Sequence, residues 1–145
     1  MELTAIVEAA WGWTGLNPDQ IIGDNDFGNL IIKDQSGRYW RLCPEDLYCK
    51  VIASSKPELD QLSQDQEFLQ DWHMSELVQH ARDRLGRLQP GFKYCLKIPG
   101  ALGGEYGGDN LAIISLSGLI SASGDIAQQI EDIPDGAQVK LSIIG

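Results

Sequence analysis

The chain has 145 residues and a mass of 15.9 kDa, which is enough for one domain with its own core. Apolar residues make up 43% of the sequence and charged residues 22%, which excludes a disordered or fibrous chain. Lys and Arg number 11 against 21 Asp and Glu, so the net charge is −10. This balance argues against direct binding of nucleic acid or an anionic membrane, because both attract positive charge, and favours a basic protein partner. A second interpretation is that the acidity only keeps the protein soluble.

Three features indicate a cytoplasmic protein. The longest apolar runs are about five residues, far below the ~18 that span a bilayer. The N-terminus lacks the basic segment and apolar stretch of a signal peptide. The three cysteines are an odd number for a disulfide framework and fit a reducing compartment better. We therefore expect a soluble cytoplasmic protein with no membrane segment.

The N-terminal third predicts one helix followed by an antiparallel sheet. Apolar residues recur at helical spacing over residues 4–11, and Gly12 ends the pattern. Short β-prone runs then alternate with turn-forming clusters, and these runs are residues 21–22, 30–32, 39–42 and 48–52. The pattern predicts a meander of three or four antiparallel strands.

Two capping boxes predict two further helices. The first, over residues 55–58, should begin a short helix that ends at Leu62, and the second, over residues 63–66, should begin a longer segment. The strongest periodic signal of the chain follows, because five apolar residues fall on one face of an amphipathic helix that ends at Gly86. These five residues are Met74, Leu77, Val78, Ala81 and Leu85.

The C-terminal part predicts a strand over residues 92–98, a strand over 111–115 and then a helix that reaches Ile130. Gly118 weakens that helix, and Gly124 is the point at which we expect it to break, with Asp125 as a new cap. A turn over residues 133–136 and a final strand over 139–144 complete the pattern. The whole predicts one α+β domain over residues 1–145, in which amphipathic helices pack on a largely antiparallel sheet.

No metal or cofactor site is predicted. His73 and His80 are seven residues apart, which on one helix separates them by ~10 Å, too far for a single zinc ion. The cysteines, Cys43, Cys49 and Cys95, lack the spacing of a zinc or redox motif. We expect the histidines to be structural polar residues and the cysteines to be small buried residues.

Residues 100–110 are rich in glycine, with five glycines in the first nine positions. The stretch lacks the lysine of a phosphate-binding loop, and Glu105 and Asp109 would repel phosphate. Two interpretations remain for it. It is a tight structural loop, or it is a shaped acidic loop that docks into a partner with Tyr106 as an aromatic anchor.

Several segments together resemble a known family. The most distinctive is residues 94–106, with the sequence YCLKIPGALGGEY. Further matching segments are residues 26–30, 39–46, 85–86, 113–116, 123–127 and 134–136. Over about residues 20–145 the chain is similar to the C-terminal domain of bacterial type VI secretion immunity proteins that protect against DNase effectors, formerly a domain of unknown function.

The resemblance implies a non-enzymatic, cytoplasmic antidote that binds the nuclease domain of a toxin and blocks it. In two-domain members of this family a separate N-terminal domain shares the toxin contacts, and here only about 20 residues precede the matching region. Charge and predicted exposure, independently of the resemblance, select five candidate partner-binding residues in two segments. These are Glu105, Tyr106 and Asp109 on the glycine-rich loop, and Glu45 and Asp46 on the turn that begins at Pro44.

Two other classes of function stay open. An intracellular scaffold or binding module unrelated to toxins would show the same acidity, and the identity of the partner would distinguish it. A small hydrolase or isomerase would need a concave pocket that contains at least one carboxylate with a raised pKa. The sequence leaves the oligomeric state undefined.

Overall fold

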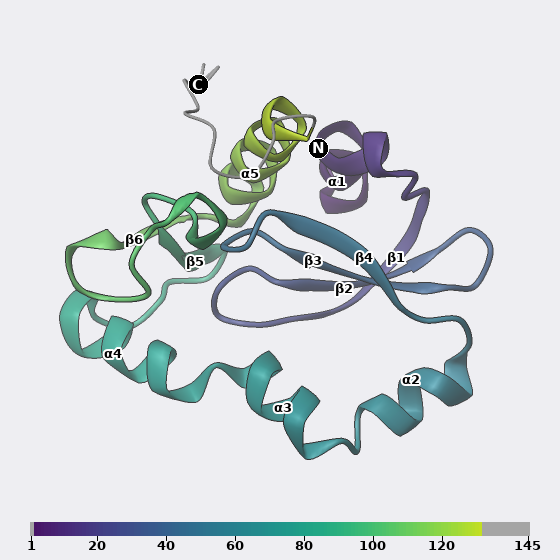
Figure 1. Cartoon of the computed structure of the whole chain (residues 1–145), viewed down its shortest axis with the longest axis horizontal. Helices are drawn as coiled ribbons and strands as arrows, with labels where there is room; N and C mark the ends of the chain where they lie inside the picture. Colours follow the sequence, from purple (N-terminus) through teal and green to yellow (C-terminus); the bar gives the residue numbers. More distant parts are fainter. Residues whose placement is uncertain (1, 132–145) are drawn as a thin grey trace.

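A four-stranded antiparallel sheet lies at the centre of the computed structural model, which describes residues 2–131 (Figure 1). Its strands follow one another in chain order, as the sequence predicts. They are β1 (Pro18–Asp24), β2 (Leu30–Asp34), β3 (Tyr39–Cys43) and β4 (Tyr48–Ala53). The central strand β3 is buried along its whole length, so both faces of the sheet are covered.

Helices α1 (Leu3–Trp11) and α5 (Leu116–Ile130) cover one face of this sheet (Figure 1). The core between them is apolar and consists of Val7, Trp11, Leu16, Leu30, Ile32, Trp40, Leu42, Cys49, Ile120 and Ala127. The expected break in the last helix is wrong, because α5 runs unbroken through Gly124. A Cβ atom at this position would lie 2.4 Å from the backbone oxygen of Ala10. Glycine therefore permits the close crossing of α1 and α5.

On the other side of the sheet, α2 (Lys56–Leu62), α3 (Gln66–His73) and α4 (Ser75–Leu85) form an arc (Figure 1). Ser55 caps α2 as predicted, since its side chain accepts a hydrogen bond from the backbone of Glu58. The second predicted cap is wrong, because Ser63 bonds back to the α2 carbonyl of Asp60. Asp65 caps α3 instead.

The predicted amphipathic helix ends at Gly86, but it begins one residue later than the apolar stripe. Met74 has left-handed backbone angles, with φ 50° and ψ 39°, and separates α3 from α4. His73 and His80 consequently lie on different helices.

A second, two-stranded antiparallel sheet consists of β5 (Phe92–Leu96) and β6 (Leu111–Ser115). Helix α4 packs against it through a separate apolar core of Phe27, Ala81, Tyr94, Leu96 and Leu111. The glycine-rich loop connects the two strands and contains two short 3-10 turns, Gly100–Leu102 and Gly108–Asn110. The predicted α+β architecture with a largely antiparallel sheet is confirmed. The turn and strand predicted over residues 133–144 lie outside the described residues. Among residues 2–131, no helix is long and apolar enough to cross a membrane.

Candidate partner-binding site

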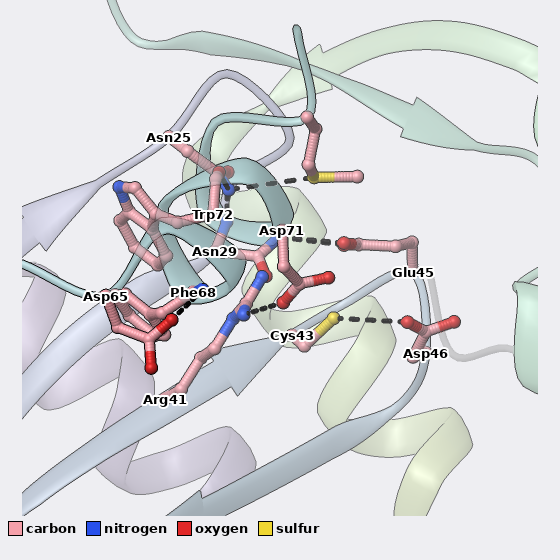
Figure 2. Close-up of polar contacts among 11 residues, drawn as sticks. Asn25, Asn29, Arg41, Cys43, Glu45, Asp46, Asp65, Phe68, Asp71 and Trp72 are labelled. Carbon is pink, nitrogen blue, oxygen red and sulfur yellow. Dashed lines mark hydrogen bonds and ion pairs between the residues drawn. The ribbon is translucent and has the colours of Figure 1, made fainter. Parts of the chain in front are cut away.

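A buried polar network lies between β3 and α3, on the opposite face of the sheet from the apolar core. Trp40 and Leu42 point into that core, so the alternation of a strand sends Arg41 to the other face. Arg41 is only 4% exposed, and it lies against α3 with its guanidinium carbon 5.2 Å from the centre of the Trp72 ring (Figure 2). A buried cation needs compensating partners.

Asn29 and Asp71 provide these partners. Arg41 donates hydrogen bonds from Nε and Nη2 to Asn29 Oδ1, at 3.0 and 2.9 Å, and Nη1 pairs with the carboxylate of Asp71. Asn29 Nδ2 in turn donates to both carboxylate oxygens of Glu45, at 3.0 and 2.9 Å (Figure 2). The amide of Asn29 therefore connects a buried cation to a buried carboxylate.

Burial shapes the protonation of this network. It raises the pKa of Glu45, and the hydrogen bonds from Asn29 offset only part of that shift. Burial alone would lower the pKa of Arg41, but nearby groups that include Asp71 raise it above the ordinary value. Arg41 is thus held as a cation, and Glu45 is the member of the network whose charge is disfavoured.

Cys43, Glu45 and Asp46 offer three potential metal ligands within 4.8 Å of one another. Burial, with Glu45 nearby, raises the pKa of Cys43, so that this side chain stays a thiol. The thiol donates a hydrogen bond to Asp46 Oδ2 at 3.7 Å, and Glu45 is bonded to Asn29. Because these side chains are bonded to one another and to Asn29, they fit a hydrogen-bonded turn better than a metal centre.

The two segments that the sequence selects as partner-binding candidates contact each other. The hydroxyl of Tyr106 donates a hydrogen bond to Asp46, and the backbone N–H of Gly100 donates to the backbone oxygen of Glu45 at 2.7 Å. Gly100 also lies directly under the tyrosine, because a Cβ atom there would be 2.0 Å from Tyr106 Oη. The turn after β3 and the glycine-rich loop therefore form one surface.

Asn110 and His80 hold the loop in shape. Asn110 Nδ2 donates to the backbone oxygens of Ile98 and Glu105, at 2.9 and 2.7 Å, and its Oδ1 accepts from the backbone of Ile98 at 2.8 Å. His80 Nε2 accepts a hydrogen bond from the backbone of Gly108 at 3.2 Å. The loop is thus attached to α4.

Four of the five candidate residues are accessible. Asp46, Glu105 and Asp109 are exposed, Tyr106 is 48% exposed, and Asp109 pairs with Arg84 of α4. The predicted exposure of Glu45 is wrong: it is 5% exposed, because its carboxylate turns inward to Asn29. Partner binding by these residues stays a prediction.

Sequence reasoning missed the network beneath the candidates, namely Asn29, Arg41 and Asp71. One signal was available for Arg41, because it stands between Trp40 and Leu42 in a short β-prone run. A cation at that position implies a second buried face that contains a counter-charge.

Two hollows border this surface. A groove of about 700 Å³ lies beside the loop and is lined by Gln70, Met74, Glu76, Leu77, His80 and Tyr106. A smaller cavity of about 320 Å³ lies between the β5–β6 sheet and α5, and Glu45 is among its lining residues. The remaining lining of this cavity is mainly apolar, with Leu96, Ile114 and Leu119 as examples.

Comparison with known proteins identifies a family. The sequence model described as "T6SS immunity protein Tdi1, C-terminal" matches residues 53–127, just over half of the chain. Among solved structures, the chain is similar to "Crystal structure of Atu4351 from Agrobacterium tumefaciens", with a TM-score of 0.55 and 15% identity over 83% of this chain and 62% of that one. That likeness concerns the fold, and no curated protein matches the sequence. The chain belongs to the family of C-terminal domains of the T6SS immunity protein Tdi1.

Proposed function

We propose that this chain is the immunity component of a type VI secretion effector–immunity pair, which binds its cognate effector and neutralises it. The family match over residues 53–127 carries this proposal. The matched region contains α2–α4, the second sheet and the whole glycine-rich loop. The loop surface formed with Asp46 is the part of the chain that we assign to the effector.

The charge of the protein supports a nuclease as the effector. The cleft of a nuclease is basic because it binds phosphates, and an acidic protein can compete with nucleic acid there. The net charge of −10 provides that acidity, and Asp46, Glu105 and Asp109 expose carboxylates on the loop surface. Inhibition would follow from occupation of the cleft.

The cysteines support a binding role over a catalytic one. Burial raises the pKa of Cys49 to about 12 and that of Cys95 to about 11, and it raises the pKa of Cys43 further. Each side chain is therefore a thiol at neutral pH and a weak nucleophile. A reducing cytoplasm, where an immunity protein would meet its effector, fits three free cysteines.

The test uses the toxin-like protein encoded next to this chain in the native host. Its toxin domain is expressed in a bacterial host with and without the chain, and growth, integrity of the chromosomal DNA and complex formation by gel filtration are measured. We expect restored growth, intact DNA and a stable complex. If the chain restores growth but the DNA of unprotected cells is also intact, immunity is retained and a DNase effector is excluded. Absence of both rescue and complex would contradict the proposal.

A small hydrolase is a second candidate, because Glu45 has a raised pKa and lines the cavity of about 320 Å³. Against it, both carboxylate oxygens of Glu45 are already bonded to Asn29. An acid–base mechanism also needs a second group, and Lys97 is the other ionisable side chain besides Cys95 among the described lining residues. Hydrolysis of a panel of esters that is lost in Glu45→Gln, with the fold intact, would favour this candidate.

A further inference from the structure

The groove beside the loop owes its shape to the junction of α3 and α4. Met74 adopts left-handed backbone angles there, which disfavour any residue with a side chain. Asn25, from the turn after β1, compensates: its Nδ2 donates to the backbone oxygen of Trp72 at 2.8 Å and contacts Met74 Sδ at 3.7 Å. The bend separates two helices that would otherwise continue as one, and it lies at the wall of the groove.

The inner surface of the groove is largely apolar and partly aromatic. Its lining includes the half-buried Met74 and Leu77 of the α3–α4 region and Tyr106 of the glycine-rich loop. Tyr106 is held from two directions, by its hydrogen bond to Asp46 and by its contact with Gly100. The ring is therefore a fixed surface on which a flat group can stack.

The charge at the groove is negative and uncompensated. Glu76 is an exposed lining residue, and Glu105 directly precedes Tyr106. Within residues 2–131, neither carboxylate has a cationic partner, while the nearby Arg41 is buried and bound to Asn29 and Asp71. His80, also in the lining, accepts a hydrogen bond at Nε2 from the backbone N–H of Gly108.

We propose that this groove binds an arginine side chain of the effector, an inference that rests on the proposed function. The methylene stem lies on Met74 and Leu77, and the guanidinium stacks on Tyr106 next to Glu76. Each feature of the groove matches one part of an arginine side chain. The apolar wall suits the methylene stem, and the aromatic ring and the carboxylate both suit the guanidinium.

Arginine fits better than lysine for a physical reason. The guanidinium is planar, stacks on an aromatic face and binds a carboxylate with two parallel hydrogen bonds. An ammonium is more strongly hydrated, so it loses more solvation when it enters a groove with apolar walls. A basic nuclease cleft would supply such a side chain.

The first experiment tests the groove alone, with N-acetyl-arginine amide as the probe. The probe is titrated into 15N-labelled protein, and amide shifts are compared with those caused by the citrulline analogue, which is isosteric and uncharged. We expect saturable shifts around Met74, Leu77 and Tyr106 with the arginine probe, weakened about fivefold in Glu76→Gln. Glu8→Gln is the matched control and leaves the affinity unchanged, because Glu8 is exposed on α1, which lies on the opposite side of the sheet from α3 and α4 (Figure 1). Shifts outside the groove, or equal shifts with citrulline, overturn the proposal.

The second experiment separates the groove from the proposed function. Affinity for the effector toxin domain is measured for the wild type, Glu76→Lys and Glu8→Lys, which carry the same change of charge at two sites. We expect at least a tenfold loss for Glu76→Lys and less than a twofold change for Glu8→Lys. Equal affinity of Glu76→Lys and the wild type overturns the docking proposal alone. Failure of the wild type to bind any effector overturns the proposed function, and the first experiment still decides on the groove.

Discussion

The two faces of the central sheet are held by different physical means. Towards α1 and α5 the contacts are apolar, with Trp11 and Ile120 fully buried among aliphatic side chains of the strands. Towards α3 the contacts are directional, from Arg41 to Asn29 and on to Glu45. Apolar burial stabilises a fold without fixing single atoms, whereas a fully bonded polar network fixes positions and adds little net free energy.

The polar face of the sheet continues into the candidate surface, whereas the apolar face does not. Glu45 is bonded to Asn29 through its side chain and to the loop through its backbone, and the next residue, Asp46, holds Tyr106. The apolar face thus mainly stabilises the fold, and the polar face positions the glycine-rich loop.

The largest expected effect comes from the apolar face. Trp11→Ala removes a fully buried indole and its hydrogen bond to the backbone of Ile120, and we expect it to lower the free energy of unfolding by about 3–5 kcal/mol. Urea denaturation followed by circular dichroism measures this loss. Trp13→Ala, at the half-buried neighbour that stacks on Trp11, is the control and should cost clearly less. Equal losses would contradict the central role of Trp11.

On the polar face, Asn29→Leu keeps the volume but leaves the Arg41 cation and the Glu45 carboxylate without their common partner. We expect a loss of about 3 kcal/mol in urea denaturation, because buried charges become unpaired. The loop should change as well: the amide of Gly100 should exchange faster with solvent, since its acceptor belongs to Glu45. A large loss of stability with unchanged exchange at Gly100 would separate the network from the loop.

Carboxylates at the two faces should respond oppositely to pH. Burial raises the pKa of Asp34, but hydrogen bonds, first of all from Trp40, outweigh it and hold the pKa well below its usual range. Its contribution is therefore complete above the unfolded value of about 4 and is lost as the pH falls below it. The pKa of Glu45 is raised, so stability falls as the pH rises from about 4 through the folded pKa.

Denaturation midpoints between pH 2 and 7 measure both effects. Asp34→Asn should reduce the loss of stability below pH 4, and Glu45→Gln should reduce the decline above it. If both variants changed stability only below pH 4, or only above it, the opposite pKa shifts of the two carboxylates would be refuted.

The smallest expected effect on stability is at the surface. Tyr106→Phe removes the hydrogen bond to Asp46 but keeps the ring on Gly100, and we expect a cost below about 1 kcal/mol because the residue is 48% exposed. Amide exchange in residues 105–108 should become faster, which solution NMR measures. A cost comparable to that of Trp11→Ala would place Tyr106 in the stabilising core and contradict the assignment of stability to the apolar face.

The apolar face could be predicted from the sequence, and the polar face could not. Alternation along residues 30–32 and 39–42 and the helical spacing of residues 4–11 are local patterns, so they predict the meander and α1 correctly. The break at Met74 depends on Asn25, which is distant in the sequence, and therefore leaves no local signal.

The same limit applies to the candidate site. Charge and turn chemistry select Asp46 and Tyr106 separately, but their contact joins positions 60 residues apart. The burial of Glu45 depends on Asn29, which comes from another turn. Contacts between distant loops depend on how the two sheets are placed, and this is not encoded in the periodicity of either segment.

The attachment of the loop by Asn110 has a consequence for how such proteins diversify. Among residues 2–131, the partners of the Asn110 side-chain amide are backbone atoms of Ile98 and Glu105, so these bonds do not depend on which side chain stands at position 105. Position 105, which is exposed, can then accept substitutions while the backbone keeps its course. If the loop surface binds the effector as proposed, point mutations there would change specificity without the need for a new loop.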